Sequence, residues 1–137
     1  MIHDATQSYF QKQNDVLTRH NITTAASTFI TGTDIVYEPQ WFWPDGTRAI
    51  HRHVLREVDL KPVEGQIQNR VAYQEVTRMM GELAAIYCDL GAVHQQLGRF
   101  YPYREALDDT NWALLEGLKK MIDPSGIMNP GALGLGN

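Results

Sequence analysis

The alternation of hydrophobic and polar residues changes its period several times along the chain, and each change marks a predicted element. The first is a helix over about residues 5–20, ended by Asn21. Its apolar side consists of Tyr9, Phe10, Val16 and Leu17. Threonine and β-branched residues then predict two strands, Thr23–Ile30 and Ile35–Trp43, joined by a turn at residues 31–34. Pro39 places the second strand at a sheet edge or at a bulge.

Two longer periodic segments occupy the second half of the chain. Apolar residues at three- and four-residue steps predict a helix over about residues 69–90, which Gly91 ends in the left-handed conformation. Its buried side comprises Val76, Met79, Met80, Leu83, Tyr87 and Leu90. A last helix is predicted over Arg104–Ile122, with Asp108 and Asp109 favouring its first turn. The stripe expected to be buried comprises Leu107, Leu114, Leu115, Leu118, Met121 and Ile122.

The remaining segments are polar or irregular. Residues His51–Gln66 read as a connection with a short helical piece around His53–Glu57, and Ala92–Tyr103 as irregular or extended chain. The order helix, two strands, long helix, loop, helix indicates an α+β fold rather than alternating βαβ units. Because two strands alone make a poor sheet, further strands lie either in the polar connection, in another chain, or in residues absent from this one.

Composition narrows the class of protein. The chain is 43% hydrophobic and 20% charged, as globular proteins are, and its net charge of −4 argues against nucleic-acid binding. No apolar run approaches the roughly 20 residues that span a bilayer. The N-terminus has no basic region before an apolar core, so we expect no signal peptide. The single cysteine, Cys88, favours a reducing compartment such as the cytoplasm, and its helical position favours a packed thiol over a reactive one.

An aromatic cluster marks the second predicted strand, where alternation divides the side chains between two faces. One face carries Tyr37, Pro39, Trp41 and Trp43, and the other carries Glu38, Gln40 and Phe42. The aromatic face could line a pocket for a planar ring or an aromatic substrate. The candidate substrate-pocket residues are Tyr37, Glu38, Gln40, Trp41 and Trp43. The alternative interpretation is a packed core strand or an interface edge.

A second candidate site lies in the loop between the last two predicted helices. Two glycines bracket His94 there, and Arg99 and Tyr101 follow closely. A histidine can act as a general base or proton carrier, and an arginine can hold a carboxylate or a developing anion. The tyrosine could orient a hydroxyl group. The alternative is an ordinary loop histidine beside a surface arginine.

His51 and His53 are the only residues whose spacing suggests a metal site. No third ligand stands at tight spacing on the same side, so we expect no metal there. The sequence also contains no P-loop, Gly-rich dinucleotide turn or nucleophile elbow.

The C-terminal stretch is unusually restricted for a chain end, since residues 123–131 contain two prolines and two glycines. It reads Leu118-Lys119, then Ile122-Asp123-Pro124-Ser125-Gly126-Ile127-Met128-Asn129-Pro130-Gly131. This pattern resembles the C-terminal signature of FAD-linked oxidases of the vanillyl-alcohol-oxidase type. Residues 91–103 resemble the glycine-bracketed loop of the same family, and the two matches together cover about residues 89–133.

The resemblance implies a role for each part of the chain. Residues 1–122 would be a partial cap or substrate domain, half of a ferredoxin-like antiparallel sheet packed by two or three helices. Residues 123–137 would be a tail that returns to an FAD-binding domain. Asn129 would approach the flavin of FAD, with Pro130 and Gly131 fixing its backbone. His94, Arg99 and Tyr101 would lie towards the substrate and form the candidate catalytic group, while the flavin carries out the hydride chemistry.

The sequence departs from the family in its loop. Aligning Leu97-Gly98 with the family's Ile-Gly puts His94, Gln95 and Gln96 over the Glu-His-Gly of many 2-hydroxyacid members. The family histidine is therefore absent at its own place. Residues 38–45 also lack the histidines with which such members can bind a metal. An alcohol or phenolic substrate thus fits better than a metal-assisted 2-hydroxyacid oxidation.

The chain is much shorter than a complete member, so we expect a piece of an FAD-dependent oxidoreductase that lacks the FAD-binding domain. Alone it should neither retain FAD nor turn over substrate, and its tail should be frayed or docked on a neighbouring copy. The alternative is a small α+β domain that binds a ligand or protein and completes its sheet as a homo-oligomer.

Overall fold

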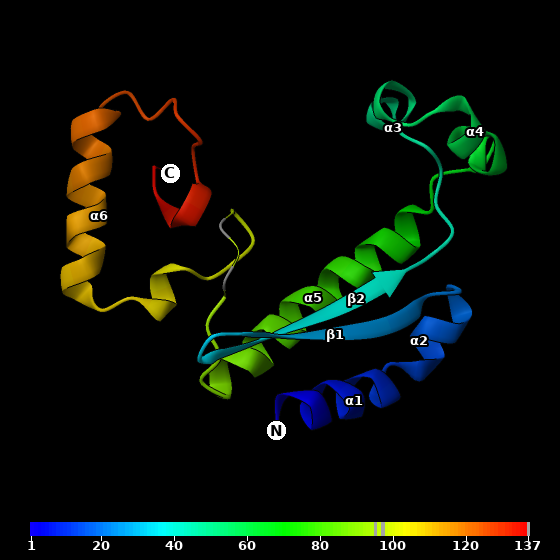
Figure 1. Cartoon of the computed structure of the whole chain (residues 1–137), viewed down its shortest axis with the longest axis horizontal. Helices are drawn as coiled ribbons and strands as arrows, with labels where there is room; N and C mark the ends of the chain where they lie inside the picture. Colours follow the sequence, from blue (N-terminus) through cyan, green and yellow to red (C-terminus); the bar gives the residue numbers. More distant parts are fainter. Residues whose placement is uncertain (95, 97, 137) are drawn as a thin grey trace. The chain divides into compact units, whose positions relative to one another are not determined.

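The computed structural model describes residues 1–94, 96 and 98–136, and the chain divides into two compact units, Met1–Ile86 and Tyr87–Asn137. The division falls inside the longest helix, α5 (Arg70–Asp89). Unit 1 contains most of the elements in Figure 1. They are α1 (Ile2–Lys12), α2 (Asn14–Arg19), β1 (Thr23–Thr31), β2 (Asp34–Phe42), α3 (Ala49–Val54), α4 (Glu57–Leu60) and the 3₁₀ turn η1 (Lys61–Val63).

The sheet of unit 1 is a single antiparallel hairpin, with Thr23 paired to Phe42 at one end and Thr31 to Asp34 at the other. Gly32 occupies the tight turn with a φ of +61°, a conformation that glycine adopts without strain. Pro39 pairs with Ala26 in an unbroken ladder, which confirms its predicted place at a sheet edge. The polar connection contributes no strand among the described residues, so the first explanation for the missing strands is wrong.

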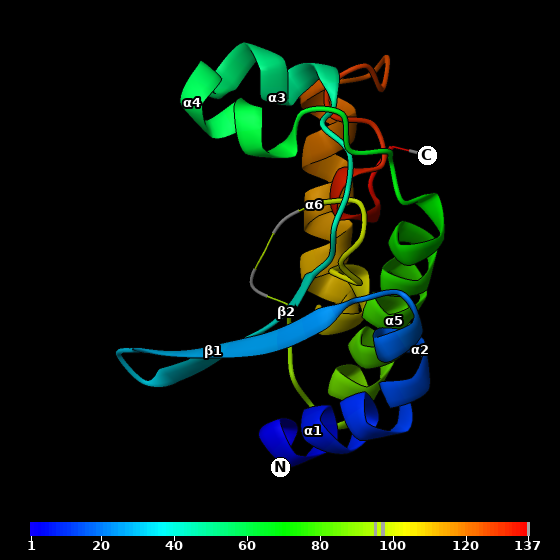
Figure 2. The ribbon, with the colours of Figure 1, turned by 90° about the vertical axis from the view of Figure 1, so that its right-hand side faces the viewer.

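The core of unit 1 forms where α1, β2 and α5 meet, as Figures 1 and 2 show. Phe10 on α1 packs edge-on against Trp41 of β2, with ring centroids 5.7 Å apart. Tyr9, on the neighbouring position, donates a 2.5 Å hydrogen bond to Glu82 of α5. The buried apolar residues of this core are Tyr9, Phe10, Leu17, Ile22, Ala72, Val76, Met79 and Leu83. Helix α1 is therefore fixed on one side by an aromatic contact and on the other by a hydrogen bond.

Two local predictions for unit 1 are wrong. The first helix is interrupted at Gln13, whose carbonyl accepts the N–H groups of Val16 and Leu17 and begins a separate helix, α2. The connection is helical over Ala49–Val54 and Glu57–Leu60 rather than around residues 53–57. Its extended break at Leu55 falls in the middle of the predicted piece.

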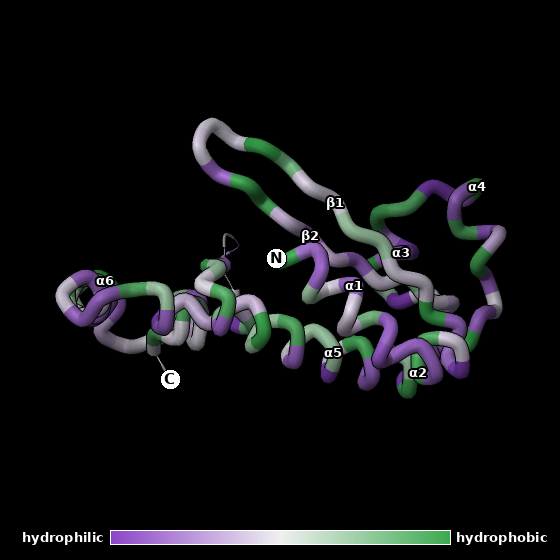
Figure 3. The backbone as a smooth tube through the Cα atoms, turned by 90° about the horizontal axis from the view of Figure 1, so that it is seen from below, coloured by the Kyte–Doolittle hydropathy of each residue, from purple (hydrophilic) through white to green (hydrophobic). Residues whose placement is uncertain are grey.

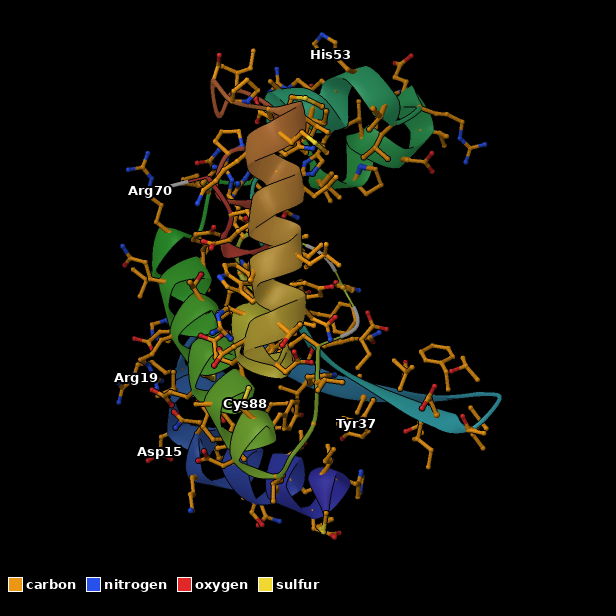
Figure 4. The ribbon with its side chains drawn as sticks, turned by 90° about the vertical axis from the view of Figure 1, so that its left-hand side faces the viewer. Asp15, Arg19, Tyr37, His53, Arg70 and Cys88 are labelled. Carbon is orange, nitrogen blue, oxygen red and sulfur yellow. The ribbon has the colours of Figure 1, made fainter. Side chains whose placement is uncertain are left out.

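Helix α5 agrees closely with its prediction because both of its ends carry strong signals. At the start, the Asn69 side chain accepts the N–H of Ala72 at 3.0 Å. At the end, Gly91 adopts a φ of +78°, and the Ala92 N–H bonds back to the Tyr87 carbonyl at 2.9 Å. Cys88 lies one position beyond the buried stripe and is exposed (Figure 4), so the predicted packed thiol is wrong.

Unit 2 is built around α6 (Asp109–Ile122), with short 3₁₀ turns at Arg104–Ala106 (η2) and Ala132–Gly134 (η3). The helix begins five residues later than predicted, because the Asp108 side chain accepts the N–H groups of Thr110 and Asn111 at 2.9 Å. The predicted burial of its stripe is also wrong. Four of its residues are exposed, namely Leu114, Leu118, Met121 and Ile122.

The whole architecture confirms the predicted α+β class, with a small antiparallel sheet and several helices. Within the part of the chain that the structure describes, no helix combines the length and the apolar character needed to cross a bilayer.

Candidate functional site

The loop after α5 brings together two of the three predicted catalytic residues. The rings of His94 and Tyr101 pack with centroids 5.2 Å apart. The Tyr101 hydroxyl donates to Gln96 Oε1 at 2.5 Å, and His94 Nε2 lies 4.0 Å from the Cys88 sulfur. Gly98 packs beside the Tyr101 ring, since a Cβ there would lie at an ordinary contact distance of 3.7 Å. The loop therefore holds an imidazole and a phenol side by side.

Burial shapes the chemistry of His94. The half-buried imidazole loses part of its hydration, which lowers its pKa below the ordinary histidine value. The neutral ring then predominates at neutral pH and can accept a proton from a hydroxyl group. Tyr101 and Cys88 are its neighbours among the described residues.

Arg99, the third predicted catalytic residue, is exposed, and the structure gives it no contact with His94 or Tyr101. Gln95 and Leu97, on which the alignment with the family loop depends, lie outside the described residues. Gln96 was not among the predicted site residues, although it accepts the Tyr101 hydrogen bond. No motif in the sequence could have identified it.

The C-terminal tail is organised by one buried carboxylate, Asp123. Its two oxygens accept the N–H groups of Ile127 and Met128, each at 3.0 Å. The Lys119 ammonium donates to Asp123 Oδ2 at 2.5 Å and also to the Met128 carbonyl. The Lys119 ammonium is the main reason why the pKa of Asp123 lies below its usual range, and the two backbone N–H groups add to it. The sequence analysis did not predict the ion pair between Lys119 and Asp123, although their i, i+4 spacing is typical of such pairs on a helix.

The predicted flavin-contacting residues follow this turn on a sharply bent backbone. Asn129 has a φ of +45° and Gly131 a φ of +76°, and both Asn129 and Pro130 are exposed. The chain then returns towards the glycine-bracketed loop, where the Leu133 N–H donates to the Gly98 carbonyl at 3.0 Å. Leu135 is buried. The expectation of a frayed tail is therefore wrong, because the tail is hydrogen-bonded within its own unit, whereas docking on another copy stays a prediction.

The loop, helix and tail of unit 2 match the sequence model of a known protein family. Residues 91–133 match the family model described as FAD linked oxidases, C-terminal domain. This part of the chain is an FAD-linked oxidase C-terminal domain. The match begins at the glycine that ends α5 and finishes at Leu133, the residue bonded to Gly98.

Curated relatives extend the similarity beyond the FAD-linked oxidase C-terminal domain. An uncharacterised FAD-linked oxidoreductase, YgcU, of Escherichia coli strain K12 is 31% identical over 97 residues, which are 66% of this chain and 18% of the relative. The protein of the same name in E. coli O157:H7 is 35% identical over 66 residues, 47% of this chain and 12% of the relative. This chain thus spans less than a fifth of the length of these relatives. No solved structure matches it.

The predicted substrate-pocket residues of β2 lie on both faces of the hairpin. Tyr37 and Trp41 face α1, where Tyr37 contacts His3 and Trp41 contacts Phe10. Glu38 and Gln40 lie on the opposite face, where the Gln40 amide donates to Glu38 at 3.4 Å. Strand alternation separates the two groups. These contacts favour the interpretation of a packed strand over that of an open aromatic wall.

Two buried donors, one near the end of β2 and one just after it, have no partner among the described residues. The indole Nε1 groups of Trp41 and Trp43 lie out of contact with solvent and make no hydrogen bond among the described residues.

The histidines His51 and His53 form no metal site. His51 accepts the Arg48 N–H and His53 contacts the Ala49 carbonyl, and no group of three potential ligands occurs in the described part of the chain.

Proposed function

We propose that this chain supplies the substrate-covering part of an FAD-dependent oxidoreductase that oxidises an alcohol, phenolic or hydroxy-acid substrate. The hydrogen bond between Leu133 and Gly98 carries this proposal, because it joins the tail to the loop that holds His94 and Tyr101. The residues that we propose to contact the flavin and the substrate thereby belong to one unit. The relatives, which are described as FAD-linked oxidoreductases, support FAD as the cofactor.

In this proposal the tail supplies the contacts to the flavin. Exposed Asn129 and Pro130 stand on a backbone held by Gly131, and Asp123 fixes the turn that precedes them. In the assembled enzyme, Asn129, Pro130 and Gly131 would lie against the isoalloxazine. Bound there, FAD supplies the hydride acceptor. A separate FAD-binding domain would hold its phosphates and adenine.

The loop residues would act on the substrate. Neutral His94 would accept the proton of the reacting hydroxyl, since its burial keeps it unprotonated at neutral pH. The exposed guanidinium of Arg99 would pair with a carboxylate or with a developing alkoxide. Tyr101 would orient the hydroxyl group, and Gln96 holds its phenol in place.

The proposal is tested by supplying the missing domain. The chain is co-expressed with the FAD-binding portion of the E. coli K12 relative, without that protein's own matching segment. We expect a complex whose flavin spectrum shifts on assembly and whose flavin is reduced anaerobically by one substrate class among alcohols, phenols and 2-hydroxyacids. Asn129→Ala should abolish the spectral shift, and His94→Ala should slow reduction by about 100-fold or more.

His53→Ala, on the exposed surface of α3, serves as the matched control and should leave both readouts unchanged. If the purified chain neither joins the flavoprotein nor alters its spectrum, the proposal fails. Stoichiometric FAD on the isolated chain would also contradict it.

The tip of the hairpin supports a second candidate function, a domain that completes its sheet with another copy. Figure 3 shows hydrophobic segments on both strands beside the turn. Ile30 and Ile35, which pair across the strands, are 80% and 72% exposed. Light scattering tests this function, because a dimer that becomes a monomer in Ile30→Lys supports it and an unchanged mass excludes it.

A further inference from the structure

Unit 1 contains a cavity of about 590 Å³ between the start of α3 and the start of α5. Small-molecule pockets usually measure about 300–1,000 Å³. Three arginines, Arg48, Arg52 and Arg70, line this cavity, together with a single carboxylate, Asp45. A cationic cavity is notable in a chain whose net charge is −4.

The wall of the cavity is tightly built, and its carboxylate is already engaged. Asp45 Oδ1 accepts the N–H groups of Gly46 and Asn69 at 2.9 and 2.7 Å, which ties the loop to the start of α5. Gly46 packs so closely that a Cβ would lie 2.6 Å from the Gln66 carbonyl oxygen. Asn69 in turn caps Ala72. Asp45 is therefore committed to the backbone, and the arginines are the charged side chains of the cavity that remain to bind a ligand.

The three arginines differ in how many contacts their side chains already make within the protein. Arg48 lies over the Tyr73 ring at 5.4 Å and 3.8 Å from Asp45, so its position is partly fixed. Arg52 and Arg70 form no ion pair within the described part of the chain, unlike Arg78, which is paired with two glutamates. Figure 4 shows the Arg70 side chain extending outward from the first turn of α5, and this side chain is exposed to solvent.

We propose that this cavity binds a small organic anion through its carboxylate or phosphate group. Guanidinium groups match the geometry of both groups and can bind each through two parallel hydrogen bonds. Arg52 and Arg70 would hold the charged group, and Arg48 would contribute a third contact. The ring of Tyr73 and the amides of Gln68 and Gln74 line the rest of the cavity and would contact the body of the ligand. This site belongs to unit 1, whereas the proposed flavin and substrate contacts belong to unit 2.

A titration followed by amide NMR tests the proposal on the whole chain. Inorganic phosphate and succinate are the two probes, added at constant ionic strength. We expect saturable shifts confined to residues 45–52 and 68–74. Arg52→Gln and Arg70→Gln should each raise the apparent Kd about fivefold or more, and Arg52→Lys should have an intermediate effect because it keeps the charge but loses the fork.

Arg19→Gln is the matched control, because Arg19 is exposed on α2 and does not line the cavity. Saturable binding that responds to the cavity variants but not to Arg19→Gln supports the proposal, and the tighter probe identifies the preferred group. Shifts that stay linear with concentration, or an Arg19→Gln effect as large as that of Arg52→Gln, would overturn it. Since no flavin is present, the outcome is independent of the co-expression experiment.

Discussion

At the scale of single residues, His94 links the stability of unit 2 to pH. Its folded pKa lies below that of an unfolded chain, about 6.5, because burial disfavours the charged ring. The unfolded chain therefore takes up the proton first, so the contribution of His94 is complete above that pH and declines as the pH falls through it. Urea unfolding of unit 2 between about pH 5 and 7.5 should show this decline in the native chain, and His94→Gln should flatten it. An unchanged slope in His94→Gln would contradict the assignment, and His53→Gln is the control.

Trp41 raises a different question at the same scale, because its ring packs well while its indole N–H is unpaired. An unsatisfied buried donor costs about 1–3 kcal/mol. Trp41→Phe keeps an aromatic ring against Phe10 and removes that donor, so we expect the free energy of unfolding to change by less than about 1 kcal/mol. Trp41→Ala should lose about 2 kcal/mol or more, since the ring contact disappears. Denaturant unfolding followed by circular dichroism measures both losses, and equal losses would contradict the prediction, because they would show that a phenyl ring does not replace the indole against Phe10.

At the scale of elements, the tail depends on Asp123. Asp123→Ala removes the acceptor for Ile127, Met128 and Lys119 together, so amide exchange over residues 126–135 should accelerate about tenfold or more. Exchange in the middle of α6 should change little. Because the folded pKa of Asp123 is lowered, the contact is complete above the unfolded value of about 3.9 and is lost only as the pH falls through the folded one. Asp109→Ala, at the opposite end of α6, is a suitable control.

The same elements show how far the sequence alone could lead. Helix α5 was predictable because its period is long and Gly91 ends it. The start of α6 was hidden, since Leu107 continues the apolar period across the Asp108 cap. The break at Gln13 involves a partner 65 residues away, Arg78, which donates to its side chain. Local patterns hold no information about such a contact.

In the candidate site, too, contacts between residues close in sequence could be predicted, and contacts between distant residues could not. His94 and Tyr101 could be assigned to one loop because they are close in sequence, and the structure places their rings together. The bond from Leu133 to Gly98 joins a backbone N–H to a backbone carbonyl, groups that are not specific to these residue types, so the sequence could not predict it. The arginine cavity was missed because Arg48, Arg52 and Arg70 come from segments that no shared motif connects.

At the scale of the whole molecule, the two units are unequally stabilised. Unit 1 buries eight apolar side chains, whereas the buried apolar residues of the described part of unit 2 are Tyr87 and Leu135. Since apolar burial is the main favourable term in folding, unit 2 should open more readily. Amides in α6 should therefore exchange about tenfold or more faster than those of residues 72–83 in α5.

Met79→Ala separates this arrangement from a single cooperative fold. Met79 is fully buried in unit 1, and its truncation should cost about 2–5 kcal/mol there. Protection of residues 72–83 should fall by that amount while exchange in α6 stays the same. If both helices lost protection equally, the units would unfold together.

The exposed stripe of α6 should change the amide exchange of this helix when the enzyme assembles. The stripe consists of Leu114, Leu118, Met121 and Ile122. If an FAD-binding domain covers that stripe, exchange in α6 should slow only in the co-expressed complex, and Leu114→Lys should weaken the complex without changing the exchange of α5 in the free chain.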